Sequence, residues 1–385
     1  MSRLNPLMLC ILFVILSPQA FAQEADSSRS GLIRRYLDYI LKPDADPSEP
    51  QLMIYPTVGF APETSWEFGF STLYVYYAKR DIKNRLSEIS AFTFFTLENQ
   101  YGIWLDHALY SDRDKWFFLG RARFQSFPLL YYGIGPGSPV EPLAQVDANY
   151  LLLRERVLRK LRRNLFLGLE VDFQKLSRVD FVPQENEENL TLPTGANGSA
   201  NLGLGLGLVY DNRHNVLNVR DGFFSELAFL RYDPAWGSEF AFSSLISDTR
   251  YYWSMPNQRD VIATQLFAQF TGAGETPFNQ LALMGGESLM RGYYLGRFRD
   301  DHLLASQIEY RLLPFGFSER WGAAAFLAAG QVFSNQNPLA INRTLLTAGA
   351  GLRFLLFPQK DIYTRLDFAV TRDGTGVYFF IGEAF

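Results

Sequence analysis

Apolar residues alternate with small or polar residues along most of the chain from Gln51 onward. The clearest case is the segment 202–209, where Leu202, Leu204, Leu206 and Leu208 alternate with three glycines. A period of two places successive side chains on opposite faces of a β-strand. In a soluble sheet the second face would be polar and solvated, whereas glycine there suits a close-packed interior. The pattern therefore predicts strands with an apolar exterior and a crowded interior.

Later segments repeat this alternation with charged residues on the inner face. The predicted inward residues are Gln307, Glu309 and Arg311, then Gly349, Gly351 and Arg353, then Arg365 and Asp367. Near the start, an aromatic face made of Trp66, Phe68, Phe70, Tyr74 and Tyr76 opposes Glu67 and Ser71. Any one such strand would fit a soluble sandwich, but the whole set favours strands whose outer face contacts lipid.

The strand-like segments are numerous enough to close into a barrel. Their centres fall near residues 56, 71, 92, 105, 121, 151, 169, 206, 227, 245, 266, 308, 327, 351, 366 and 381. An even strand number suits a single-chain outer-membrane barrel, and closure leaves no unpaired edge in hydrocarbon. We predict an all-β fold, a transmembrane antiparallel β-barrel of about sixteen strands over residues 51–385. The long intervals 129–144, 183–200 and 271–300 predict extracellular loops or elements folded into the lumen.

The first 22 residues have the pattern of a secretory signal peptide. Arg3 precedes the apolar run Leu7 to Leu16, and Ala20 and Ala22 are the small residues of a cleavage site. The run is short for a helix that must cross roughly 30 Å of hydrocarbon. Cleavage after Ala22 would remove Cys10, the only cysteine, which suits passage through an oxidising periplasm.

Residues 23–50 form a polar lead-in to the first strand. Apolar residues recur at helical spacing between Leu32 and Leu41, and Pro43 ends the pattern. One interpretation is a partly ordered periplasmic segment, and the other is an amphipathic helix on the barrel mouth or the membrane surface.

The last strand ends the chain with an aromatic residue. Val377, Phe379, Ile381 and Phe385 are predicted to share one face. A final strand with a terminal aromatic is suited to capture by an assembly machine through strand addition. We therefore expect Phe379, Ile381 and Phe385 to act as a closing-strand assembly signal, with the barrel assembly machinery as a partner during biogenesis.

The segment from Gly285 to Tyr293 contains the tetrad Met290-Arg291-Gly292-Tyr293 in the long interval before the twelfth strand. A hydrophobe-Arg-Gly-aromatic tetrad in this loop resembles the bacterial surface antigen family, whose barrel domain is shared by the BamA and TamA outer-membrane assembly factors. Three further segments support the resemblance, which covers about residues 51–385 and is clearest over 200–385. They are Asp211 to Gly222, Ser306 to Arg311 and Phe379 to Phe385.

Two features depart from the pattern of that family. The aromatic-x-Asp-x-Gly motif of the family is Phe326 to Gly330 here, with Ala328 in place of the acid. The periplasmic polypeptide-transport repeats that precede the family's barrel do not fit within residues 23–50. The resemblance implies a tetrad loop that is tucked into the lumen as a plug or latch.

Arg291 needs a carboxylate if it lies in the lumen, because an unpaired buried charge is costly. Ala328 cannot provide one. By strand parity Glu309 and Asp367 both face inward, and Glu309 lies on the strand that directly follows the loop. We predict Glu309 as the partner ahead of Asp367. The alternative is that Arg291 lies in a solvated surface loop.

Composition and residue spacing limit the other function classes. The formal net charge of −4 becomes −5 once Arg3 is removed, which does not favour nucleic-acid binding. His107, His214 and His302 lack metal-ligand spacing, and Ser306 near His302 has no evident orienting acid. We therefore expect no catalytic residues, no metal and no cofactor.

Together, these observations predict an integral protein of the outer membrane that contacts its lipid. The resemblance implies a barrel that assists polypeptide insertion or passage, with a polypeptide client as a possible partner. The alternative is a passive channel or a structural surface protein. The sequence does not identify the client or the oligomeric state.

Overall fold

The computed structural model describes residues 48–385 except 127, 185–189, 214–217, 258 and 359–360. The predicted signal peptide at 1–22 and nearly all of the predicted segment 23–50 lie outside these residues. No helix among the described residues is long and apolar enough to cross a membrane.

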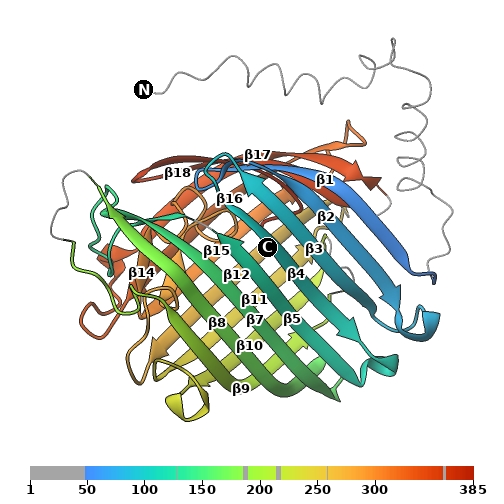
Figure 1. Cartoon of the computed structure of the whole chain (residues 1–385). Helices are drawn as coiled ribbons and strands as arrows, with labels where there is room; N and C mark the ends of the chain where they lie inside the picture. Colours follow the sequence, from blue (N-terminus) through green and yellow to red (C-terminus); the bar gives the residue numbers. More distant parts are fainter. Residues whose placement is uncertain (1–47, 127, 185–189, 214–217, 258, 359–360) are drawn as a thin grey trace, which may run out of the picture. The chain divides into compact units, whose positions relative to one another are not determined.

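Sixteen long antiparallel strands form a closed wall (Figure 1). They are β1 Gln51–Ala61, β2 Ser65–Tyr77, β3 Leu86–Thr96, β4 Tyr101–Tyr110, β5 Trp116–Ser126, β7 Ala144–Arg162, β8 Leu165–Pro183, β9 Ser199–Asp211, β10 Gly222–Tyr232, β11 Phe242–Ser254, β12 Asp260–Gly272, β15 His302–Leu312, β16 Trp321–Phe333, β17 Leu345–Phe357, β18 Ile362–Thr371 and β19 Gly374–Ile381. Each predicted centre lies in a different strand of this set. The predicted barrel of about sixteen strands is confirmed.

Short elements lie in the connections between wall strands. Strand β6 Leu129–Tyr131 pairs with β7, and β13 Ala282–Met284 pairs with β14 Phe298–Asp300 as a small separate ribbon. The 3-10 helices are η1 Ala78–Arg80, η2 Asp112–Asp114, η3 Pro234–Trp236 and η4 Ile341–Arg343. The ribbon β13–β14 brackets the tetrad, so the tetrad loop has its own two-stranded base.

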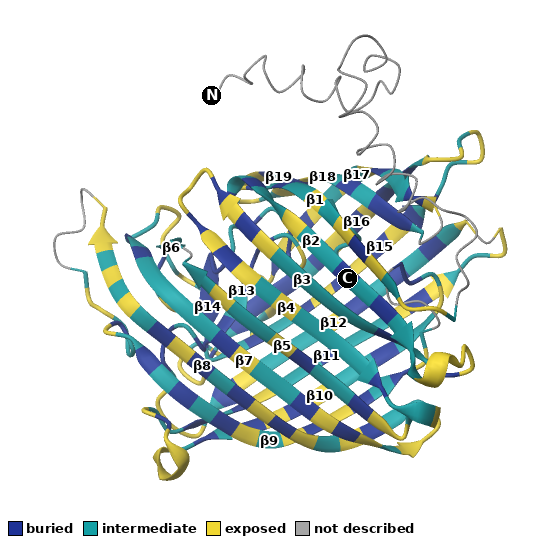
Figure 2. Cartoon of the chain, turned by 45° about the vertical axis from the view of Figure 1, so that its right-hand side comes forward, coloured by how far each residue is buried: buried dark blue, intermediate teal, exposed yellow. Residues whose placement is uncertain are grey.

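The predicted inside–outside alternation is present in the wall, where exposed and buried residues form alternating bands (Figure 2). On β9, Leu204 and Leu206 are exposed, while the neighbouring glycines face inward. A Cβ added to Gly203 would lie 2.6 Å from the Tyr232 ring. Glycine is therefore required here because large aromatic side chains fill the interior.

The connections differ in length between the two ends of the barrel. The long segments 127–143, 184–198, 273–301 and 334–344 leave from the end that carries the β1–β2 turn. Long extracellular loops and shorter periplasmic turns are typical of outer-membrane barrels, so this end is extracellular. Strands β7 and β8 have 19 residues each, whereas β18 has 10 and β19 has 8.

Candidate functional site

The tetrad lies inside the barrel, between β13 and β14. Met290 (φ +57°) and Gly292 (φ +102°) both have left-handed backbone, which turns the chain sharply on each side of Arg291. A Cβ on Gly292 would lie 2.6 Å from Cγ2 of Thr371 on β18. Glycine is needed at this position both for the backbone conformation and for close contact with the wall.

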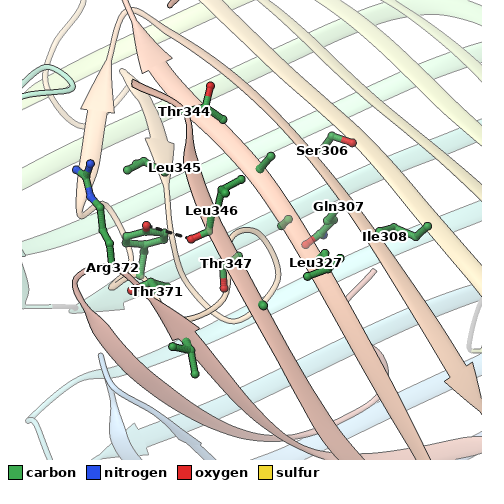
Figure 3. Close-up of a pocket in the computed structure, with 15 residues that line it drawn as sticks. Ser306, Gln307, Ile308, Leu327, Thr344, Leu345, Leu346, Thr347, Thr371 and Arg372 are labelled. Atoms are coloured by element: carbon green, nitrogen blue, oxygen red, sulfur yellow. Dashed lines mark hydrogen bonds between the residues drawn. The ribbon is translucent and has the colours of Figure 1, made fainter. Parts of the chain in front are cut away.

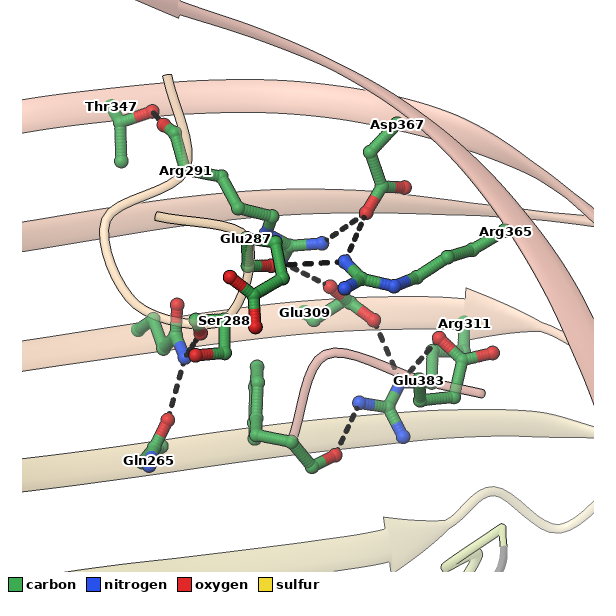
Figure 4. Close-up of polar contacts among 12 residues, drawn as sticks. Gln265, Glu287, Ser288, Arg291, Glu309, Arg311, Thr347, Arg365, Asp367 and Glu383 are labelled. Carbon is green, nitrogen blue, oxygen red and sulfur yellow. Dashed lines mark hydrogen bonds and ion pairs between the residues drawn. The ribbon is translucent and has the colours of Figure 1, made fainter. Parts of the chain in front are cut away.

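Arg291 points toward the wall and contacts two carboxylates (Figure 4). Its Nη1 donates to Oδ2 of Asp367 at 2.6 Å, and its Nη2 donates to Glu309. All three side chains have no exposed surface. Sequence reasoning ranked Glu309 ahead of Asp367, and the structure brings both to the arginine. The alternative prediction, that Arg291 lies in a solvated surface loop, is wrong because its side chain is fully buried.

Three further arginines contact the same two acids, and Figure 4 labels two of them, Arg311 and Arg365. Arg353 Nη1 lies 2.6 Å from Asp367, Arg311 Nε lies 2.8 Å from Glu309, and Arg365 Nη1 lies 3.0 Å from Asp367. Glu383 completes the group by pairing with Arg353 at 2.9 Å. We call these seven residues the tetrad cluster: Arg291, Glu309, Arg311, Arg353, Arg365, Asp367 and Glu383. Four guanidinium groups share three carboxylates, so loss of any acid raises the excess positive charge of the cluster from one to two in a buried space.

The segment Phe326 to Gly330, which lies on β16, provides an aromatic ring for Arg291 in place of an acid. The guanidinium carbon of Arg291 lies 3.5 Å from the ring centroid of Phe326, in a cation–π contact. Ala328 packs against Met290 in a buried apolar cluster. The acid that the family resemblance expects at position 328 is thus replaced by small apolar volume, and the carboxylates come from β15 and β18.

Tyr293 lies where the pairing between β17 and β18 ends. Register pairing between β17 and β18 ends at Thr347 and Thr371, and just beyond it the Tyr293 hydroxyl donates to the Leu346 carbonyl at 3.2 Å. The Thr347 hydroxyl donates to the Arg291 carbonyl. A hollow of about 670 Å³ lies over this part of the wall, lined by Tyr293 and by apolar side chains including Ile308 and Leu327 (Figure 3).

The same loop touches both sides of the seam where β1 meets β19. On the β19 side, the Gly292 N–H donates to the Tyr378 hydroxyl at 2.8 Å. On the β1 side, the Leu295 N–H donates to Oε1 of Glu63, in the β1–β2 turn, at 2.6 Å. Burial raises the pKa of Glu63 to about 7. The tetrad loop therefore bridges the seam from within the lumen.

The C-terminus departs from the face predicted for it. Strand β19 ends at Ile381, and Gly382 (φ +94°) turns the chain away. Phe385 is buried against Val219, Tyr252 and Val261, and its carbonyl accepts a bond from Arg311 at 2.9 Å. The prediction that Phe385 shares a face with Val377, Phe379 and Ile381 is wrong, because period-two parity stops where the strand does. The assembly role of Phe379, Ile381 and Phe385 stays a prediction.

Sequence reasoning placed several of these residues without grouping them. Parity already put Arg311, Arg353 and Arg365 on the inner face, but it gave no sign that they share two acids. Tyr378 and Glu383 were missed as site residues. Tyr378 follows Val377 on the opposite parity, so its inward direction could have been read from the last strand.

Comparisons with known proteins agree with this architecture. The model of the Omp85 superfamily domain matches residues 141–385. BamA from Haemophilus ducreyi lacking POTRA domains 1–3 superposes with a TM-score of 0.55 and 15% identity, covering 86% of this chain and 69% of that one. CdiB from Acinetobacter baumannii gives 0.54 and 11% identity, covering 93% and 68%. CdiB from Escherichia coli gives 0.54 and 12%, covering 94% and 72%. No curated protein matches the sequence.

Proposed function

The chain belongs to the Omp85 superfamily as an outer-membrane β-barrel, and from this premise we propose that it assists polypeptide insertion or passage by separation of β1 from β19. The fold alone does not establish an activity, so the proposal depends on the seam and on the loop that bridges it.

The observation that carries the proposal is the weakness of the β1–β19 seam. Among the described residues, Phe60 and Phe379 form the one register pair across it, whereas every other junction between neighbouring wall strands has at least eight. Ladder hydrogen bonds are what hold a wall closed in hydrocarbon. Separating β1 from β19 should therefore require less free energy than separating any other pair of neighbouring wall strands. An opened strand edge can accept an incoming strand.

A second observation concerns the space beside the seam. A cavity of about 320 Å³ is lined by residues of β1 to β4 together with Ile381 and Gly382 at the end of β19. Aromatic and acidic side chains both face it, including Trp104 and Glu88. A strand entering through the seam would meet this space first.

The tetrad loop gives the proposal a latch. Because the loop contacts β19 through Tyr378 and the β1–β2 turn through Glu63, opening the seam requires at least one of these contacts to break. The tetrad cluster fixes the loop to β15 and β18 at the same time. Loop position and seam opening are thereby coupled.

A reversible crosslink tests the proposal. We would replace Phe60 and Phe379 by cysteine, reconstitute the protein in vesicles and measure how fast a second, unfolded barrel protein inserts. Partners in register on neighbouring strands lie close enough for a disulfide. The oxidised seam should reduce insertion to the rate of empty vesicles, and a reductant should restore it.

The matched control places the crosslink elsewhere in the wall. Leu206 and Phe229 are register partners on β9 and β10 with exposed side chains, whereas Phe60 and Phe379 at the seam are half-buried. Cysteines there should leave the insertion rate unchanged. Full activity of the locked seam would contradict the proposal. Ion conductance without insertion activity in the unlocked protein would favour the alternative, a passive channel.

A further inference from the structure

Three periplasmic turns carry a strong excess of positive charge. They are the turn 78–85 between β2 and β3, the segment 111–116 from the end of β4 to the first residue of β5, and the segment 159–164 from the last residues of β7 to the start of β8. They contain ten basic residues, Lys79, Arg80, Lys83, Arg85, Arg113, Lys115, Arg159, Lys160, Arg162 and Arg163, against the three acids Asp81, Asp112 and Asp114. We call this group the basic collar.

Side-chain contacts join the three turns into one surface. Lys79 pairs with Asp112 at 2.6 Å, and Asp114 is approached by Lys160 at 3.4 Å and by Arg85 at 3.5 Å. Arg85 also donates to Asn164, which ties the first turn to the third. The collar is therefore a continuous feature of the folded wall and not a property of separate turns.

The internal ion pairs engage two of the three acids and leave several cations without an ion pair. Asp112 and Asp114 are engaged within the collar. Among the ion pairs of the described residues, none includes Lys83, Arg113, Lys115, Arg162 or Arg163. Arg113, Arg162 and Arg163 are exposed. These exposed guanidinium and ammonium donors, which form none of those ion pairs, are suited to an external anion.

The collar also has an apolar, outward-facing side. Trp116 and Arg159 are register partners on β5 and β7, and the guanidinium carbon of Arg159 lies 5.4 Å from the Trp116 ring centroid. Trp116 is 40% exposed and Leu161 is 54% exposed, whereas Phe117 and Leu158 on the opposite face are buried. Aromatic residues at the ends of outward faces mark the border between hydrocarbon and headgroups.

We propose that the basic collar binds the phosphate headgroups of anionic phospholipids in the periplasmic leaflet of the membrane. Arginine on an outward face is costly within hydrocarbon but is stabilised at the headgroup level, where phosphate oxygens accept its hydrogen bonds. Clusters of basic residues at a membrane edge gain further from the negative surface of anionic lipid.

Position favours lipid over an acidic polypeptide as the occupant. Arg159, Trp116 and Leu161 point away from the lumen at the end of membrane-spanning strands, where the membrane itself lies. A soluble polypeptide would have to displace lipid to reach them. Arg162, the last residue of β7, and Arg163 in the following turn are exposed directly after Leu161.

The test compares lipid bound by the full chain and by two charge-matched variants. Each protein is reconstituted in mixed phosphatidylcholine and phosphatidylglycerol, extracted gently, and analysed by native mass spectrometry for the lipid that stays bound. The collar variant carries Arg113→Gln, Arg162→Gln and Arg163→Gln. The control carries Arg259→Gln, Arg320→Gln and Arg343→Gln, which removes the same charge from exposed sites outside the collar.

The parent protein and the control should retain phosphatidylglycerol enriched over its bulk fraction, and the collar variant should retain it at the bulk fraction. Heat-modifiable migration on gels shows that each protein is folded. Absence of enrichment in the parent, or equal loss in both variants, would overturn the proposal. Unchanged lipid enrichment in the collar variant with lost binding of a soluble acidic polypeptide would overturn it in favour of a protein partner. None of these outcomes depends on insertion activity.

Discussion

Two of the buried ionic networks among the described residues are built differently. One joins wall strands only. Arg154 with Asp172, and Arg156 with Glu170, are direct register partners on β7 and β8, and Arg156 reaches Glu226 on β10 at 2.5 Å. The other is the tetrad cluster, in which Arg291 comes from a loop whose strands β13 and β14 pair, among the described residues, only with each other.

The difference lies in what holds the charges in place. The backbone ladder fixes Arg154 and Asp172 opposite each other whether or not they attract. Arg291 is held at Glu309 and Asp367 by side-chain contacts: the pairs themselves, the Phe326 ring, and the bonds of the tetrad with Thr347 and Tyr378. Breaking the wall network should therefore lower stability without moving the backbone. Breaking the tetrad cluster should release a loop.

The largest expected effect is that of Glu309→Ala. It removes a carboxylate shared by Arg291, Arg311 and Arg353, and loss of one partner of a buried pair costs about 3–5 kcal/mol. Urea unfolding should show this loss, and limited proteolysis should cut the tetrad loop. Arg291→Ala should do the same, and the double variant should add little. Fully additive effects would mean that the two residues do not act as a pair.

Removal of Phe385 should have the next largest effect. Loss of a buried phenylalanine costs about 3 kcal/mol, and the carbonyl that accepts from Arg311 moves with it. Outer-membrane yield should fall several-fold relative to deletion of the exposed loop residue Leu192. Equal yields of the two deletions would remove the assembly argument.

Gly292→Ala tests whether close contact with the wall positions the loop. The added methyl would meet Thr371 at a left-handed backbone, with an expected cost of about 1–3 kcal/mol and faster cleavage of the loop. Gly237 has the same φ of +102° with nothing within 4 Å of an added Cβ. Gly237→Ala should leave loop cleavage unchanged. Similar loop cleavage in the two variants would indicate that contact with Thr371 is unimportant.

Asp172→Asn is the counterpart in the wall network. Replacing a charged acceptor by a neutral one of the same shape should lower the free energy of unfolding by about 1–2 kcal/mol. The tetrad loop should stay as resistant to protease as in the parent protein, because the β7–β8 ladder holds its register. Release of the loop by this change would show that the two networks are coupled.

The smallest expected effect is the pH dependence of the Glu63 contact. A folded pKa of about 7, above the usual value of 4.5, means that the folded state binds the extra proton between these values. The contribution of protonated Glu63 to the free energy of unfolding is therefore complete below pH 4.5 and is lost as the pH rises through about 7. Glu63→Gln should flatten the fall in thermal stability over this window. An unchanged slope would assign the pH dependence to other groups.

Much of the fold follows from the sequence through a local property. Successive side chains of a strand point to opposite faces. The face of each residue could therefore be assigned without any partner strand, as it was for the leucines and glycines of 202–208 and for the inward charges of 307–311 and 365–367. The Met290 to Tyr293 tetrad was found by its residue order and by its place in a long interval. These features depend on neighbours in the chain.

The tertiary structure decided the features that depend on distant residues. Asp367 and Glu309 both reach Arg291 because closure brings β15 and β18 to one side of the same loop. Phe385 turns inward because parity no longer applies beyond Gly382. The single register pair at the seam and the joining of three basic turns depend on contacts between residues far apart in the chain. An alternating pattern fixes which way a side chain faces, but long-range packing alone fixes what it meets.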